Sequence, residues 1–132
     1  MFKVTSPGKM NETFARAFNS RDIDCLLALY EPAALLRTDA SAETATRRSE
    51  IGTKLAELLE LPGTMVSENN FYIQHGDLAL LRADYELRDN EGAAIMSGSS
   101  AEIVRQQIDG AWLYVIDHAA GASLPRILRR SS

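Results

Sequence analysis

The spacing of apolar residues divides the chain into a helical first half and a strand-rich second half. Between residues 10 and 18, apolar side chains recur at intervals of three and four, at Met10, Phe14, Ala17 and Phe18. This period predicts an amphipathic helix. Ser6 and Pro7 form a suitable start, because serine can cap free N–H groups and proline at the first helical position loses no hydrogen bond. We expect this helix to end at residues 19–21.

Two further helices are expected before the strands. Asp22 can cap a short second helix that carries Leu26, Leu27 and Tyr30, and Pro32 should end it. A third helix is expected at residues 49–61, because apolar residues recur on one side and Pro62 and Gly63 follow. Between these helices, the sequence predicts a short strand at residues 33–37 and a polar loop at residues 38–46.

From residue 65 onward the apolar period changes to two, which is typical of strands. Four strands are predicted at residues 66–74, 78–87, 94–106 and 112–119, separated by turns rich in Gly, Asp and Asn. The second of them alternates between an apolar face and a charged face, as in an antiparallel sheet that is covered on one side. The fold class is therefore α+β, with three N-terminal helices packed on a curved, mainly antiparallel sheet.

Composition limits the possible functions. The 132 residues fit one domain, and 14 basic against 18 acidic residues give a net charge of −4. A pI near 5.2 argues against nucleic-acid binding. No apolar run is long enough to span a membrane, and no secretion signal pattern is present, so a cytoplasmic protein is expected. One cysteine, two distant histidines and no glycine-rich phosphate loop predict neither a metal nor a cofactor.

Several strings carry a family resemblance. They are FNSRDID at 18–24 with LALYEP at 27–32, AEIVRQQ at 101–107 with DGAW at 109–112, and WLYVIDH at 112–118. Together with the order of elements, they resemble the nuclear-transport-factor-2-like (NTF2-like), or SnoaL-like, superfamily. Within it, the chain is most similar to ketosteroid-isomerase-like proteins of the domain-of-unknown-function 4440 type. The resemblance covers residues 8–121 and leaves 122–132, with Arg126, Arg129 and Arg130, as a tail.

The resemblance implies a cone-shaped domain with a pocket between sheet and helices, and a homodimer formed through the outer sheet face. Ketosteroid isomerase uses a carboxylate base, and a tyrosine and a protonated carboxylic acid that stabilise an oxyanion. By resemblance, the tyrosine position falls at Phe14, the base at Thr38 with Asp39 next to it, and the acid near Glu102. The acid is kept at Glu102, the tyrosine is lost at Phe14, and the base is displaced by one residue to Asp39. This argues against the mechanism of ketosteroid isomerase.

Glu102 is the main acid/base candidate, since it lies between Ala101 and Ile103 in the middle of a long strand. Burial would raise the pKa of such a carboxyl and fit it for proton transfer. The alternative is a glutamate on the outer face or paired with an arginine.

His118 is the second candidate. It shares a face with Trp112, Tyr114 and Ile116 by period two, and the resemblance places this face inward. Histidine there could exchange protons near neutral pH, or it could be a histidine at the core edge bonded to the backbone. Asp117 would face outward unless a bulge redirects it.

The residues expected to line the pocket, or else to close the core, are Phe14, Tyr30, Tyr85, Ser100, Trp112 and Ile116. Two functions remain open. One is a pocket that binds a small apolar or aromatic metabolite and supports cofactor-free acid/base chemistry, such as isomerisation or dehydration. The other is a non-catalytic dimerisation or ligand-sensing module. An open cavity of roughly 300 Å³ or more with convergent polar groups would favour the first function. A cavity filled by the aromatic side chains of Phe14, Phe18, Tyr85 and Trp112 would favour the second.

Overall fold

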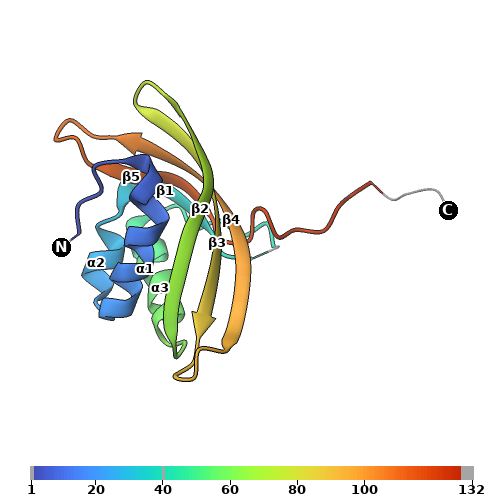
Figure 1. Cartoon of the computed structure of the whole chain (residues 1–132). Coiled ribbons are helices and arrows are strands. Elements are labelled where there is room, and N and C mark those ends of the chain that lie inside the picture. Colours follow the sequence, from blue (N-terminus) through green and yellow to red (C-terminus); the bar gives the residue numbers. More distant parts are fainter. Residues whose placement is uncertain (1, 40, 129–132) are drawn as a thin grey trace.

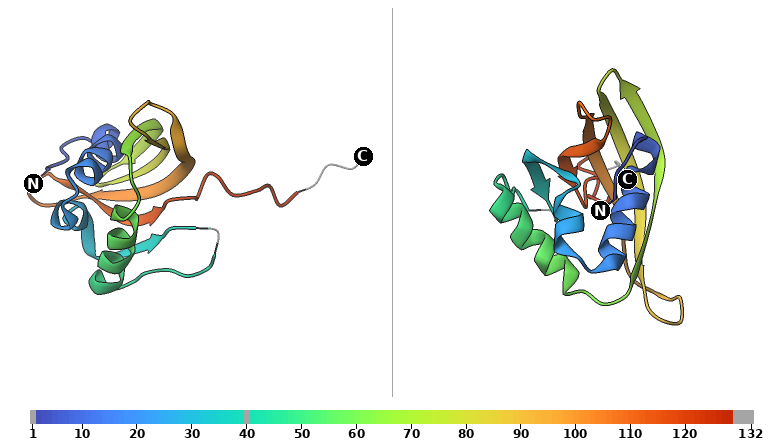
Figure 2. Two further views of the ribbon diagram at one scale, coloured as in Figure 1. Left: turned by 90° about the horizontal axis from the view of Figure 1, so that it is seen from below. Right: turned by 90° about the vertical axis from the view of Figure 1, so that its left-hand side faces the viewer.

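Helices cover one face of a strongly curved five-stranded sheet in the computed structural model, which describes residues 2–39 and 41–128 (Figures 1 and 2). Figure 1 shows α1, α2 and α3 on the same side of the sheet, with the opposite face uncovered. The elements in chain order are η1 (a 3₁₀ turn, Pro7–Lys9), α1 (Met10–Ser20), α2 (Ile23–Leu27), β1 (Tyr30–Arg37), α3 (Arg48–Leu59), β2 (Thr64–His75), β3 (Leu78–Arg88), β4 (Ala94–Gln106) and β5 (Trp112–His118).

The strand order in the sheet is β1-β5-β4-β3-β2. Strands β2 to β5 form an antiparallel meander, and β1 pairs in parallel with β5 at the edge. The predicted α+β class is confirmed. The alternation along β3 is also confirmed, because Ala79, Leu81, Ala83 and Leu87 are buried under the helices while Leu80 and Asp84 are exposed.

The first helix begins later than predicted. Pro7 opens a 3₁₀ turn, the α-helix starts at Met10, and the Ser6 side chain makes no capping hydrogen bond. The second helix is capped as expected, because the Asp22 side chain accepts a hydrogen bond from the Asp24 amide. It ends at Leu27, however, and Tyr30 belongs to β1. Pro32 lies inside β1. Proline has no N–H group to donate, and an edge strand tolerates this because one of its sides has no partner strand.

A bulge in β5 changes which side chains face the helices. Ile103 pairs with Ile116 and Val104 pairs with Tyr114, so β5 contains one extra residue, Val115, at this point. Beyond an inserted residue, the alternation of a strand reverses. Asp117 is therefore buried, Ile116 is 39% exposed, and the predicted inward facing of Ile116 and His118 is wrong.

The core lies between the helices and the concave face of the sheet. Trp112, Phe18, Tyr114 and Leu26 are among its largest buried side chains. In the described part of the chain, no helix is long and apolar enough to cross a membrane. Beyond β5, the Ala122 amide donates to the Ser99 carbonyl. Of the predicted tail, Arg129 and Arg130 lie outside the described residues.

Arg21 joins the first and third helices. It ends α1 in the left-handed conformation with φ of 59°, and its guanidinium stacks 4.4 Å from the centre of the Phe18 ring. The same guanidinium donates hydrogen bonds to the carbonyl oxygens of Leu59, Leu61 and Gly63. Leu59 is the last residue of α3, where no helical N–H group is available to its carbonyl, and Leu61 and Gly63 lie in the loop that leads to β2.

Replacing Arg21 with alanine should lower the free energy of unfolding by about 1–2 kcal/mol, because three carbonyl groups lose a charged donor. Urea denaturation would measure the loss. Arg48→Ala is the matched control, since Arg48 is exposed at the other end of α3. Equal stability of the two variants would show that the cap at the end of α3 contributes nothing.

Candidate functional site

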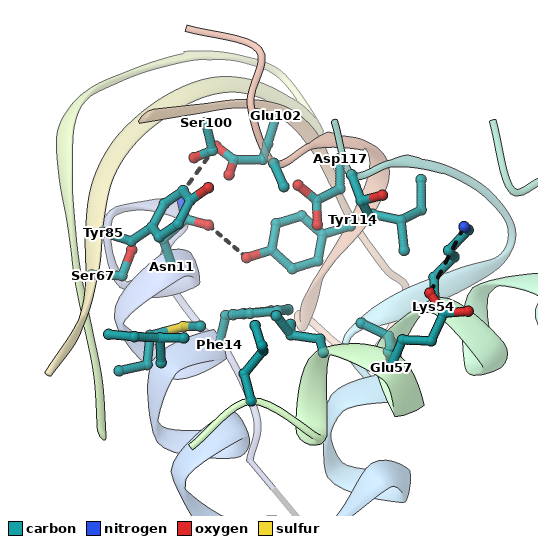
Figure 3. A pocket seen from close by; sticks show the side chains of 18 of the residues that line it. Asn11, Phe14, Lys54, Glu57, Ser67, Tyr85, Ser100, Glu102, Tyr114 and Asp117 are labelled. Carbon is teal, nitrogen blue, oxygen red and sulfur yellow. Dashed lines mark hydrogen bonds and ion pairs between the residues drawn. The ribbon is translucent and has the colours of Figure 1, made fainter. Parts of the chain in front are cut away.

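A cavity of about 280 Å³ lies between the concave face of the sheet and helices α1 and α3 (Figure 3). Its volume is close to the value expected for a small-molecule site. Phe14 and Tyr85 form part of its wall without filling it. The other two aromatic residues that could have closed it, Phe18 and Trp112, are buried elsewhere in the core. The cavity is therefore open.

Glu102 and Asp117 form the polar end of the cavity. They are directly opposite each other in the antiparallel pair of β4 and β5. Only 3% of Glu102 and 6% of Asp117 is exposed. Side chains at such positions lie about 5 Å apart at their Cβ atoms, so like charges there repel each other. Figure 3 shows both carboxyl groups directed toward the same space.

The two carboxyl groups differ in their partners. Glu102 Oε1 accepts a hydrogen bond of 3.2 Å from the amide of Asn11, on α1. Asp117 Oδ2 accepts a hydrogen bond of 2.6 Å from the hydroxyl of Tyr30, on β1. A short bond from a hydroxyl stabilises a carboxylate more than a longer bond from an amide. Asp117 is therefore the better site for the negative charge.

Burial and the charge of Asp117 raise the pKa of Glu102 to about 8, although the nearby Ser100 hydroxyl and the hydrogen bond from Asn11 oppose this rise. Burial also raises the pKa of Asp117, to about 6, and the Tyr30 hydroxyl limits the rise. Two buried carboxyl groups this close do not readily ionise together, so we expect the pair to hold one proton near neutral pH. The shorter hydrogen bond at Asp117 favours the negative charge there and the proton on Glu102.

Asn11 connects the carboxyl pair to the rest of the domain. Its amide nitrogen donates to Asn69 Oδ1 as well as to Glu102, and its carbonyl oxygen accepts a 2.6 Å hydrogen bond from the Tyr114 hydroxyl. Asn69 in turn donates to the carbonyl of Pro7. Helix α1 and strands β2, β4 and β5 are held together by this buried network, which orients the Glu102 carboxyl.

Apolar and aromatic side chains form most of the remaining wall. The aromatic lining residues are Tyr30, Tyr114, Phe14 and Tyr85. The aliphatic ones include Leu55 and Leu58 of α3, Leu61 after it, and Met65, Leu87 and Met96 of the sheet. The centres of the Tyr30 and Tyr114 rings lie 4.9 Å apart. Lys54 and Glu57 of α3 form an ion pair of 3.8 Å and are partly exposed. The cavity therefore combines an apolar body with one acidic end.

Tyr85 keeps its position because Gly98 lies opposite it. The two residues are partners in the pairing of β3 and β4, and the Tyr85 ring and hydroxyl lie across Gly98. A Cβ atom at position 98 would collide with the Tyr85 hydroxyl. Glycine at this position thus lets the ring lie flat along β4, at the side of the cavity.

The structure brings Glu102, Ser100, Phe14, Tyr30 and Tyr85 of the sequence-based candidates to this cavity. The others lie elsewhere. His118 is on the opposite side of β5, where its Nδ1 accepts from the Ala120 amide. Asp39 is exposed in the loop after β1, and its carboxylate accepts a hydrogen bond from the Ser41 amide. Trp112 borders a different, shallower hollow beside the N-terminal segment.

Sequence reasoning missed Asn11 and did not select Asp117, Tyr114 or Ser67. For Asn11 a signal was present, because it precedes Phe14 by three residues and Phe18 by seven, which places it on the buried stripe of α1. For Asp117 there was none, since the bulge at Val115 depends on the pairing with β4. In the described ranges 2–39 and 41–128, no three acidic, histidine or cysteine side chains cluster to hold a metal ion.

Comparison with solved structures identifies the fold. A protein from Thiobacillus denitrificans, named for the association domain of calcium/calmodulin-dependent protein kinase type II, superposes with a TM-score of 0.76 at 17% identity, over 92% of this chain and 98% of that one. A ketosteroid isomerase-like protein from Erwinia carotovora atroseptica superposes with a TM-score of 0.65 at 19% identity, over 83% of this chain and 88% of that one. An NTF2-like protein of unknown function from Shewanella oneidensis superposes with a TM-score of 0.66 at 16% identity, over 83% of this chain and 92% of that one. No family model and no curated protein matches the sequence. The fold is NTF2-like.

The raised pKa of Glu102 predicts a pH-dependent stability. A carboxyl that binds its proton more tightly in the folded state loses stabilisation as pH rises from the unfolded pKa toward the folded one. The free energy of unfolding should therefore fall between pH 5 and pH 8 by more than about 1.4 kcal/mol, the equivalent of one pKa unit. Urea denaturation at several pH values would measure this fall.

Glu102→Gln should reduce that fall, because a neutral amide does not titrate. Glu68→Gln is the matched control, since it makes the same change at an exposed position of β2. If the Glu102→Gln variant keeps the full pH dependence of the wild type, Glu102 does not hold a proton at neutral pH.

Proposed function

We propose that this chain binds a small apolar or aromatic molecule in the cavity and transfers protons to and from it with the carboxyl pair of Glu102 and Asp117. The observation that carries this proposal is the pair itself. Two carboxyl groups share one end of an open, largely apolar cavity, and burial raises the pKa of both. Two buried carboxyl groups side by side destabilise a fold. Carboxyl groups with strongly raised pKa values are therefore found mainly at functional sites.

Each carboxyl group has a distinct role in this proposal. Protonated Glu102 donates its proton to an electronegative atom of the ligand, and ionised Asp117 accepts a proton from a neighbouring ligand atom. The net result is movement of a proton within the ligand, as in an isomerisation. The pair is left with its proton on Asp117, and exchange between the two groups restores the starting state. No electrons are gained or lost, so the step needs no cofactor.

This arrangement differs from the residue set of ketosteroid isomerase. Phe14 cannot donate a hydrogen bond, and Asp39 lies outside the cavity. Tyr114 and Tyr30 have hydroxyl groups, but both donate to protein acceptors. The proposal therefore rests on Asp117 in place of the displaced base, and on Asn11 to orient Glu102.

A thermal-shift screen with small steroids, aromatic polyketides and short hydroxy and keto acids would test binding. A ligand at one hundred times its dissociation constant adds about 2.7 kcal/mol of stability, which raises the melting temperature by several degrees. Ser67→Phe should abolish the shift, because the side chain at position 67 lines the cavity and a phenyl ring would occupy it. An unchanged shift in this variant would place the ligand elsewhere.

For any ligand that binds, deuterium exchange at its carbon atoms in D₂O would test proton transfer. Glu102→Gln should abolish exchange while the thermal shift remains. Exchange at the wild-type rate in this variant would remove Glu102 from the chemistry. No exchange in the wild type, with any ligand that binds, would leave a binding pocket only.

A second proposal concerns the outer face of the sheet, which we infer forms a homodimer. One row of apolar residues crosses all five strands in register on this face: Ile73, Leu80, Ile103, Ile116 and Leu35. Four of them are between 36% and 61% exposed. Monomers rarely leave a continuous apolar patch of this kind in water. The association-domain name of one similar structure is consistent with this inference.

Sedimentation equilibrium would test the dimer. Leu80→Glu places a charge in the middle of the row and should shift the protein to monomers, because two buried carboxylates would face each other across a symmetric interface. Ile108→Glu is the control, since Ile108 is fully exposed in the hairpin after β4. A wild-type monomer at high concentration would contradict the proposal.

A further inference from the structure

The polar end of the cavity contains acidic groups and no basic ones. Of the residues that line the cavity, Lys54 is the only one with a cationic side chain, and its amine pairs with Glu57 at the α3 side. Glu102 and Asp117 therefore determine the charge that a ligand meets. In a medium of low polarity, the interaction between two charges is several times stronger than in water. The cavity should thus discriminate between ligands mainly by their charge.

Each carboxyl group keeps one oxygen for a ligand. Glu102 Oε1 and Asp117 Oδ2 have protein donors, whereas no hydrogen bond joins Glu102 Oε2 or Asp117 Oδ1 to a side chain of the described residues. In this part of the chain, no fully enclosed side-chain oxygen lacks a partner. The two free oxygens are consequently accessible from the cavity. The Ser67 hydroxyl, on a residue 93% buried, also lines the cavity and has no hydrogen-bond partner among these residues.

Aromatic rings surround the same end. Tyr30, Tyr114, Phe14 and Tyr85 all line the cavity, and the first two hydroxyls already donate to Asp117 and Asn11. These hydroxyls are therefore not available to an anionic ligand. The faces of aromatic rings carry partial negative charge and attract cations at close range. Ring faces and free carboxyl oxygens thus favour the same kind of ligand.

We propose that the ligand of this cavity is an organic cation, an amine or quaternary ammonium group on an apolar body, with its nitrogen between Glu102 and Asp117. The inference rests on the proposed binding in the cavity, not on proton donation by Glu102, and it specifies the ligand class. The apolar body would lie against the leucine and methionine side chains that line the cavity. A metal ion fits less well, because two carboxyl groups supply fewer oxygen ligands than hard cations require.

Binding of a cation should release a proton. The titratable groups that face Glu102 are Asp117 and Tyr114 of β5, Tyr30 of β1 and Tyr85 of β3, and α3 adds Lys54 and Glu57 at the opening. Burial raises the pKa of each of these tyrosines, so they stay neutral. A bound cation favours the ionised form of Glu102 and lowers its pKa. Affinity for a cation should therefore rise with pH up to about pH 8.

Three probes of similar size separate the possible charges: 2-phenylethylamine, 2-phenylethanol and phenylacetate. Isothermal titration calorimetry with the full chain should give at least tenfold tighter binding of the amine than of the alcohol at pH 8, and the weakest binding for phenylacetate. Between pH 6 and pH 8 the amine should gain at least tenfold in affinity, because it stays protonated over this range while Glu102 does not.

Glu102→Gln should bind the amine about as well as the wild type at pH 6, where Glu102 is already neutral. From pH 6 to pH 8 it should gain no more than about twofold, as Asp117 completes its ionisation. Glu68→Gln, at its exposed position on β2, should behave as the wild type. Circular dichroism would confirm that each variant is folded. Loss of the pH dependence only in the Glu102 variant would place the cation at this carboxyl group.

The outcomes distinguish the two proposals. Equal affinity for the amine and the alcohol, or tighter binding of phenylacetate, would overturn the cation proposal and leave the binding pocket in place. Failure of all three probes to bind at millimolar concentration, together with an empty thermal-shift screen, would overturn both.

Discussion

The burial of two carboxyl groups side by side, at Glu102 and Asp117, is the constraint on which the rest of the site depends. A second charge in this position would repel the first and lose its hydration. The structure gives the two groups different donors, the amide of Asn11 and the hydroxyl of Tyr30, and the raised pKa of both groups favours a single shared proton. The pair is stable as a neutral acid beside a carboxylate. The same condition makes it capable of giving and taking protons.

The support for this pair extends through the whole domain. Asn11 brings α1 into the network, and through Asn69 the network reaches the first turn at Pro7. Tyr30 belongs to β1, the edge strand that joins the sheet in parallel. The carboxyl pair can therefore keep its geometry only while α1 and β1 both remain packed on the sheet. The contacts that position the carboxyl pair are thus also contacts that stabilise the domain.

The fold could be predicted from sequence to a large extent. The period of three to four in the first half and of two in the second predicts helices over an antiparallel sheet, and the structure has this arrangement. For Glu102 the sequence left two alternatives, a buried carboxyl or one on the outer face, because both faces of this strand carry apolar residues. Asn11 could have been found, because it shares a helix face with Phe14. The exact start of the first helix could not, since Ser6 makes no capping bond and Pro7 begins a 3₁₀ turn.

The sequence alone determined the class of fold, the concave face of β3 and the place of Glu102 in the middle of β4. These features follow from local periodicity, which a single strand or helix carries in its own residues. Only the tertiary structure decided that Asp117, and not His118, faces the cavity. The reason is the extra residue Val115 in β5, which exists only relative to the partner strand β4. The shared proton likewise depends on a distance between two strands, and no pattern within either strand contains it.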